Sequence, residues 1–217
     1  MKKKSNIYNF VLTLIAFLIP IIFYSKLPYA IPCQFSMSTG AITNYINKPM
    51  GAFLLPLIMA LIWIGMLYLP KIDPRKSHYA KFAKSYGLIL CLILTFFFVL
   101  QIVIILVSLG FNPPVNIIIP FAAGVLLIVI GNYMPKSKSN FFYGIKTPWT
   151  LSSETSWRKT HKLGGILFVL SGLFICLSSL FLNGSITSII VLISVILSVI
   201  IIFIASYFFA KGATDLK

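Results

Sequence analysis

The sequence has very few acidic residues. Its 217 positions hold three Asp and Glu against eighteen Lys and Arg, and charged residues make up only 10% of the chain. Soluble globular domains carry about 25% charged residues, so this composition excludes that class. The three carboxylates, Asp73, Glu154 and Asp215, lie on separate segments. They therefore offer no pair of neighbouring carboxyl groups for acid–base catalysis.

Motifs for catalysis, cofactors and metals are also missing. His78 and His161 form no HExxH pattern, and the chain has no GxSxG and no phosphate-binding glycine loop. The three cysteines have no CxxC or other metal-binding spacing. Glu154 and His161 are a conceivable catalytic pair, but their spacing sets them two helical turns apart. We therefore expect no enzyme activity, no cofactor and no metal.

Apolar sequence, by contrast, is abundant. Hydrophobic residues make up 59% of the chain and the mean hydropathy is +1.00. A helix needs roughly 20 apolar residues to cross the hydrocarbon core of a bilayer. Six spans are expected, at residues 7–24, 50–69, 87–109, 116–134, 163–182 and 186–210. We predict an all-α, multi-pass protein of the cell membrane with six transmembrane helices.

The first apolar run, which follows three lysines, has a second interpretation. A positively charged start and an apolar core are also typical of a cleaved signal peptide. The run is long, however, and no small-x-small cleavage site follows it. This favours a retained transmembrane helix.

The basic residues predict the orientation. The N-terminus, the 70–86 segment, the 131–165 segment and the C-terminal tail hold sixteen of the eighteen Lys and Arg. Because Lys and Arg concentrate in cytoplasmic loops, we expect both termini and the 131–165 segment in the cytoplasm. The 26–49 loop then faces outside, and its Leu/Ile-Pro pairs predict ordered but non-helical backbone. The net charge of +15 is attributed to topology and to contact with membrane lipid, not to nucleic acid.

Charged residues are absent from the bodies of the six expected spans, which hold no Asp, Glu, Lys, Arg or His. Ion-coupled transporters usually place such groups inside the membrane. The polar residues of the spans are Gln101, Asn132 near one end, and scattered Ser and Thr, which are more typical of helix packing. Active transport is therefore the weaker hypothesis.

The 131–165 segment is the longest polar interval of the chain. Pro135 ends the fourth span, because proline cannot continue the backbone hydrogen bonding of a helix. Asn140 and Gly144 suit turn conformations that most residues resist. Thr147-Pro148-Trp149 is expected to be an extended, rigid piece. Lipid affinity has no need of this order of residues, so the pattern favours a functional segment.

A short helix is expected at the end of this interval, capped by Ser152 or Ser153. On it, Trp157 and His161 are four residues apart and would present an aromatic ring and an imidazole on one face. Arg158 would begin a basic stripe on the next face. An interfacial helix held at the membrane surface by Trp and basic residues explains the same pattern without any specific function.

The interval resembles the signature segment of the SdpI family of bacterial immunity-type membrane proteins. The matching residues are Gly131-Asn132, Pro135, Asn140, Gly144-Ile145, Thr147 to Ser152, Trp157 to His161 and Gly164-Gly165, with Lys146 where the family more often has Arg. The N-terminal part is similar to an uncharacterised domain often found ahead of that segment, through Leu27-Pro28, Ile31-Pro32, Phe35 and Gly40, with Gln34 in place of a usual His. The resemblance implies a six-span protein that protects its producer from a secreted antimicrobial peptide. It also implies a link to operon control, through a repressor held at the membrane.

We expect two regions. Residues 1–70 form a two-span region with the external Pro-rich loop, and residues 71–217 form an SdpI-like four-span region with the cytoplasmic segment 131–165. Three functions stay open: immunity by binding or occluding a peptide toxin at the membrane, a signalling receptor that captures a transcriptional repressor, and a small-molecule or lipid transporter. The candidate functional residues of the cytoplasmic segment are Asn132, Pro135, Asn140, Gly144, Lys146, Thr147, Pro148, Trp149, Trp157, Arg158 and His161. The candidate contacts for an external peptide are Pro28, Pro32, Gln34 and Phe35.

Overall fold

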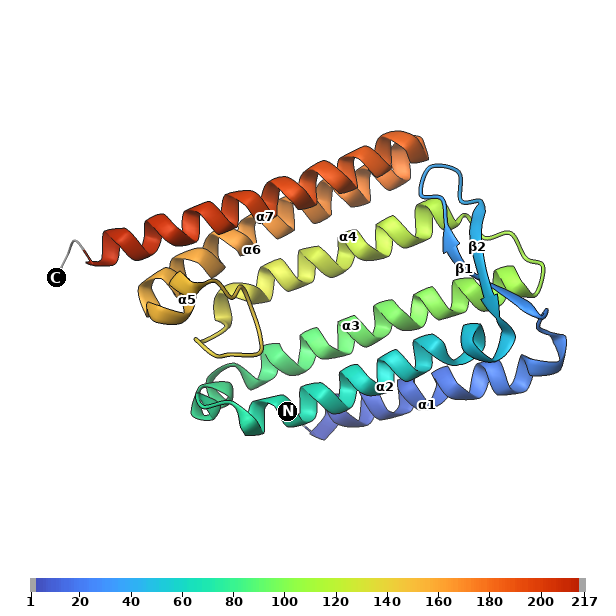
Figure 1. The fold of residues 1–217 in the computed structure, drawn as a ribbon, viewed down its shortest axis with the longest axis horizontal. Coiled ribbons are helices and arrows are strands. Elements are labelled where there is room, and N and C mark those ends of the chain that lie inside the picture. Colours follow the sequence, from blue (N-terminus) through green and yellow to red (C-terminus); the bar gives the residue numbers. More distant parts are fainter. Residues whose placement is uncertain (1–2, 215–217) are drawn as a thin grey trace.

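The computed structural model describes residues 3–214, in which six long helices run side by side (Figure 1). They are α1 (Lys3–Phe23), α2 (Lys48–Ile72), α3 (Tyr79–Ser108), α4 (Val115–Tyr133), α6 (Glu154–Phe181) and α7 (Gly184–Thr214). Short elements connect them, namely β1 (Ala30–Phe35), β2 (Ile42–Asn47), the five-residue helix α5 (Pro148–Ser152) and 3₁₀ turns at Tyr24–Lys26, Lys76–His78 and Met134–Lys136. All six long helices are long and apolar enough to cross a membrane. The predicted six-span membrane protein is confirmed.

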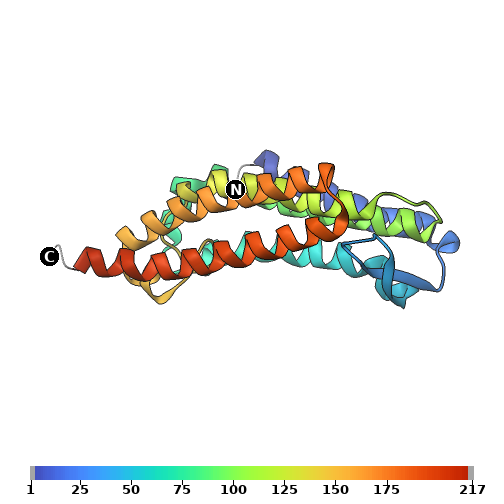
Figure 2. The same ribbon diagram turned by 90° about the horizontal axis from the view of Figure 1, so that it is seen from above.

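The long helices form two groups. α3 packs against α1 and α2, while α4 packs against α6, which in turn packs against α7. Figure 1 shows the two groups side by side, joined by α3 and α4, and Figure 2 shows the elongated shape of the bundle. We call the end with β1 and β2 the hairpin end. The other end, with the 73–78 and 134–153 segments, is called the loop end.

The expected ordered, non-helical loop is an antiparallel β-hairpin of β1 and β2. β1 packs on α2 and α3. The tip reaches the other group of helices, because the backbone of Ser38 lies against Gly184 at the start of α7. Gly40, with φ +74°, lies against Asn116 in the first turn of α4. The hairpin therefore bridges the two groups at this end.

Glycines allow α4 and α6 to approach closely. A Cβ added at Gly131 would lie 2.6 Å from the carbonyl oxygen of Gly165, and one added at Gly172 would lie 2.5 Å from that of Gly124. Small residues at such positions let membrane helices pack backbone against backbone. Gly165 thus permits close packing of α6 against α4.

Two prolines within helices leave backbone carbonyls without their usual hydrogen-bond donors. Side chains of α3 supply the missing donors. Pro20 has no N–H for the carbonyl of Ala16, four residues earlier, and the side-chain amide of Gln101 donates to that oxygen at 2.6 Å. In α2, Pro70 likewise frees the carbonyl of Met66, which accepts a hydrogen bond of 2.8 Å from the Tyr86 hydroxyl. Both donors lie on α3, so these bonds attach α1 and α2 to it.

Two expectations need correction. The short helix predicted before the fifth span is continuous with that span, since α6 runs unbroken from Glu154 to Phe181. Its N-cap is Ser153, one of the two residues expected to cap it, and the Ser153 side chain accepts from the N–H of Ser156 at 3.2 Å. No proline follows the cap, and Gly164 is buried in packing rather than ending the helix. The polar residues of the spans also include Asn9, which is fully buried in α1.

Candidate functional site

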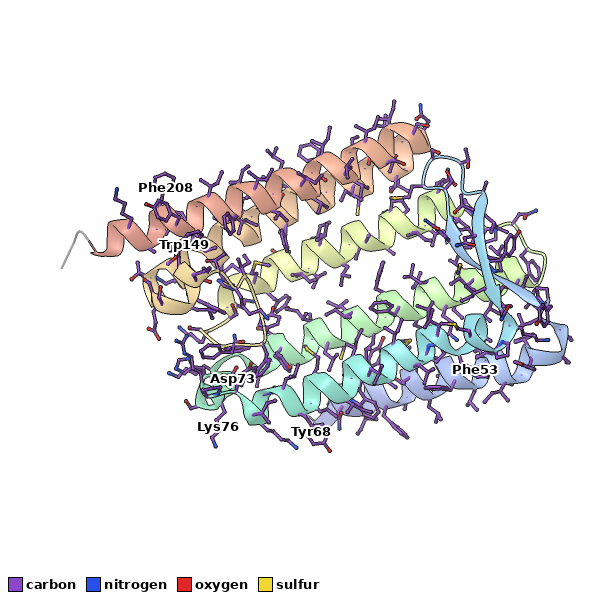
Figure 3. All side chains as sticks on the ribbon, viewed as in Figure 1. Phe53, Tyr68, Asp73, Lys76, Trp149 and Phe208 are labelled. Carbon is purple, nitrogen blue, oxygen red and sulfur yellow. The ribbon has the colours of Figure 1, made fainter. Side chains whose placement is uncertain are left out.

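The polar segment between α4 and α6 is held at the loop end by the connection between α2 and α3. Asp73 is buried there (Figure 3), and its carboxylate accepts hydrogen bonds from the N–H of Phe141 at 2.9 Å, the N–H of Arg75 at 2.7 Å and the Tyr79 hydroxyl at 2.8 Å. Burial alone would raise the pKa of Asp73. The two backbone N–H groups, the Tyr79 hydroxyl and the positive charge of Arg75 outweigh burial and lower that pKa below its usual value.

Asn140 organises the turn that faces Asp73. Its side-chain oxygen accepts from the backbone N–H groups of Phe142 at 3.0 Å and Tyr143 at 2.6 Å, and its amide nitrogen donates to the carbonyl of Lys138 at 2.8 Å. The Tyr79 hydroxyl lies 2.8 Å from Asp73 and 3.1 Å from the Asn140 oxygen, so its single proton lies between two acceptors. The side chain of Asn140 is fully buried.

Arg75 and His78 extend this connection across the segment. The Arg75 guanidinium donates to the Ser139 hydroxyl and, at 3.0 Å, to the carbonyl of Leu151, and it stacks on the Phe141 ring. His78 Nδ1 lies 2.7 Å from the carbonyl of Ser139 and donates to it, because a carbonyl oxygen only accepts. Sequence reasoning assigned the 70–86 segment to topology alone and missed these residues. The one usable signal was Asp73, a single carboxylate in an otherwise basic segment.

His161 and Trp157 are buried inside the site instead of forming an exposed face. Their rings stack with centroids 4.0 Å apart, and Trp157 donates its indole N–H to the carbonyl of Ser137 at 3.1 Å. His161 Nε2 accepts from the N–H of Ile145 at 3.0 Å, while Nδ1 lies 2.8 Å from the carbonyl of Trp157. These partners define a neutral imidazole with its proton on Nδ1.

Gly144 is required by this arrangement for two reasons. Its φ of +108° lies in the left-handed region, and an added Cβ would overlap His161 Nε2. The turn at Gly144 brings the N–H of Ile145 to the imidazole. Gly144 and His161 are thus one structural unit.

The expectation of an extended Thr147-Pro148-Trp149 piece is wrong for its last two residues. Only Thr147 is extended, while Pro148 and Trp149 begin the short helix α5, which is fastened to α7. Thr147 and Thr150 form a reciprocal capping box, in which the side chain of each accepts from the backbone N–H of the other. The Thr147 hydroxyl also donates to Ser206 at 3.1 Å. Trp149 lies beside α7 (Figure 3), with its ring edge-on to Phe203 and Tyr207.

The remaining candidates of the segment are exposed, namely Asn132, Pro135, Lys146, Pro148 and Arg158. A cavity of about 260 Å³ opens at the loop end, with Pro135, Lys138, Glu154 and Arg158 in its lining. The structure therefore divides the predicted residues into a buried or half-buried set that builds the segment and an exposed set on its surface.

At the hairpin end, the four predicted external contacts differ in exposure. Pro28 and Gln34 are exposed, Phe35 is half-buried and Pro32 is buried. Gln34 and Phe35 line a cavity of about 280 Å³ below the hairpin. Within residues 3–214, no group of three or more His, Cys, Asp or Glu side chains is placed to hold a metal ion.

The fold and the site define a multi-pass helical membrane protein with a folded polar segment fixed between two groups of helices. The chain belongs to the SdpI/YfhL protein family, whose pattern matches residues 136–206, and residues 11–60 match a domain of unknown function (DUF1648). It is 30% identical over 208 residues to Immunity protein SdpI of Bacillus subtilis (strain 168), covering 96% of this chain and 97% of that protein. No solved structure matches the chain. The resemblance stated from the sequence is confirmed.

Proposed function

We propose that the protein is an immunity protein that protects its own cell from a secreted antimicrobial peptide. The observation that carries this proposal is the 30% identity to Immunity protein SdpI over nearly the full length of both chains. The same sequence similarity supports a protein that acts by binding and not by catalysis. The membrane is the place of action, because six helices of the chain are suited to cross it.

In this proposal the loop end is cytoplasmic and the hairpin end faces outside. Of the Lys and Arg in residues 3–214, fourteen fall in segments at the loop end, and only Lys26 and Lys48 belong to the hairpin end. Positive residues are enriched on the cytoplasmic side of membrane proteins. A secreted peptide would therefore meet the hairpin end first.

The surface of the hairpin end suits an apolar peptide. Tyr29, Tyr45 and Phe111 are large, exposed side chains, with Tyr29 78% exposed. Lys48 is held back from this surface, because its ammonium donates to the carbonyl of Leu27 at 2.7 Å. Exposed apolar groups with little free charge fit a partner that is itself apolar.

Protection is proposed to arise by binding or occlusion, not by export. The bodies of the six predicted spans carry no Asp, Glu, Lys, Arg or His, and these are the groups that ion-coupled transporters use. The discriminating test is to express the chain in a sensitive strain and challenge it with the purified peptide fraction secreted by the source organism. Protection should persist after a protonophore collapses the proton gradient. Loss of protection on collapse would instead support a transporter.

A matched pair of variants tests the contact surface. Tyr29→Ser should weaken protection because it removes an exposed ring at the hairpin end. Tyr68→Ser removes a ring of comparable type, 58% exposed, on the part of α2 nearest the loop end. It should leave protection intact. Equal effects of the two variants would exclude a specific role of the hairpin surface.

A receptor that captures a transcriptional repressor is the second candidate. Lys146 and Arg158 favour it, because both are exposed on a segment whose neighbouring residues are rigidly bonded. The test is membrane recruitment of a fluorescently tagged regulator encoded beside the gene, with and without the peptide. Recruitment lost in a Lys146→Ala, Arg158→Ala double variant would support this candidate, and a regulator that stays diffuse would exclude it.

A further inference from the structure

The cavity at the hairpin end is formed jointly by the two groups of helices. Leu100 and Ile104 of α3 line one wall, and Ile119 and Pro120 of α4 line another. Strand β1 contributes Cys33 to Phe35, the turn that follows it contributes Ser36 and Met37, and the volume is about 280 Å³. No Asp, Glu, Lys, Arg or His is among its lining residues. A charged group placed there would lose its hydration without gaining a counter-charge.

The cavity also presents polar groups of the kind that pair with peptide amides. Asn116 lines it, and its carbonyl lacks the usual donor four residues later, because that residue is Pro120. Cys33 lies at an irregularity of β1, where the described hairpin gives it no partner on β2. The Gln34 amide is exposed at the rim. An acyl chain cannot use such donors and acceptors, whereas a peptide backbone can.

We infer that this cavity binds an uncharged, apolar segment of a peptide. Its apolar side chains lie between α3 and α4, and its backbone pairs with Asn116, Gln34 and the backbone at Cys33. Added strands and unpaired backbone groups are a common basis of peptide recognition. The inference rests on the proposed function and gives the secreted peptide a defined site.

Cys33 provides a direct reporter of occupancy. The full chain, with Cys91 and Cys176 replaced by serine, is reconstituted in phosphatidylcholine–phosphatidylglycerol liposomes, and the labelling rate of Cys33 by a small methanethiosulfonate reagent is measured. The probe is a capped Leu-Ala peptide of about 20 residues, long enough to enter the bilayer. Its control is the same peptide with Lys at every fourth position.

At a peptide concentration about ten times its Kd, roughly one tenth of the sites stay free, so the labelling rate should fall about tenfold. The Lys-containing peptide should leave the rate unchanged. Equal effects of the two peptides, or no effect of either, would overturn the inference. Labelling that is already slow in liposomes without peptide, yet fast in detergent, would show that a lipid chain fills the cavity and would overturn it as well.

A cavity-filling variant links this site to immunity. Ile119→Trp places a larger side chain into the cavity and should abolish both peptide-dependent slowing and protection in cells. Ile118→Trp is the matched control, because Ile118 lines a different cavity and should leave both intact. Membrane levels of both variants are compared with the unsubstituted chain.

The two proposals fail in different ways. Slowed labelling without cellular protection would support the site and contradict the immunity function. Protection that survives in a well-expressed Ile119→Trp variant would support immunity and contradict this site.

Discussion

The Nε2 atom of His161 accepts a hydrogen bond of 3.0 Å from the backbone N–H of Ile145, sixteen residues earlier in the chain. This bond fixes the segment that follows α4 onto the first turns of α6. Since the imidazole is fully buried and its other nitrogen is also bonded, His161 acts as a structural acceptor. His161, one of the residues that match the family segment, therefore has a structural role, which is to hold that segment in its folded conformation.

Gly144→Ala is expected to destabilise the protein, because the added Cβ meets His161 and the φ of +108° is unfavourable for alanine. A strained φ costs about 1–3 kcal/mol, and the overlap adds to it. Gly110→Ala is the control, since Gly110 has φ +91° but no atom within 4 Å of an added Cβ. Thermal unfolding followed by fluorescence-detected size exclusion should show the larger loss for Gly144→Ala. Equal losses would mean that the contact with His161 is unimportant.

Asp73→Asn should loosen the polar segment. It removes a charge that accepts from two backbone N–H groups and a hydroxyl, and losing such a buried acceptor costs about 1–3 kcal/mol. Limited proteolysis between residues 137 and 153 should become faster. Glu154→Gln, at an exposed position, is the control and should leave the rate unchanged. An unchanged rate in Asp73→Asn would contradict the role given to this carboxylate.

The same carboxylate predicts a pH dependence. Its pKa is lowered in the folded protein, so its contribution to stability is present above the unfolded value of about 3.9. That contribution is lost as the pH falls through the folded pKa. Unfolding measured between neutral pH and pH values below the unfolded pKa should show this loss in the unsubstituted chain and a flatter profile in Asp73→Asn. Identical pH profiles for the two proteins would contradict the assignment of this pH dependence to Asp73.

Lys146→Ala and Trp149→Ala are expected to differ. Because the Lys146 side chain is exposed, its removal should leave folding and membrane levels nearly unchanged. The loss of its charge should abolish function. Trp149 packs on Phe203 and Tyr207, so its removal should lower thermal stability and membrane levels. Lys162→Ala, another exposed lysine, serves as the control for Lys146. A fully active Lys146→Ala variant would leave the segment with a structural role only.

The orientation can be checked with single cysteines in a chain whose three native cysteines are replaced by serine. Tyr29→Cys, at a strongly exposed hairpin position, should react with an impermeant maleimide in intact cells. Lys138→Cys, exposed at the loop end, should react only after the membrane is opened. Labelling of Lys138→Cys in intact cells would refute the proposed topology.

The helices could be predicted from sequence because their signals are local. Each span follows from an apolar run, and the start of α6 follows from Ser153, whose side chain caps the helix as expected. The hairpin was anticipated only as ordered non-helical backbone. Strand pairing between residues such as Ala30 and Asn47 depends on contacts across the loop that no local pattern specifies.

The site was predicted less completely, since its main bonds join distant segments. Phe141 donates to Asp73, 68 residues away, and Tyr79 to Asn140, 61 residues away. The helical spacing of Trp157 and His161 was read correctly as a shared face, but spacing cannot tell whether that face is exposed or covered. Here the turn at Gly144 covers it.

The proline-freed carbonyls of α1 and α2 have a consequence for how the protein is made. A chain grows from its N-terminus, so α1 and α2 reach the membrane before α3 is complete. At that moment the carbonyls of Ala16 and Met66 lack the donors, Gln101 and Tyr86, that satisfy them in the finished protein. Unsatisfied backbone groups are costly in hydrocarbon. We therefore expect α1 and α2 to be less stable in the membrane until α3 supplies these two donors.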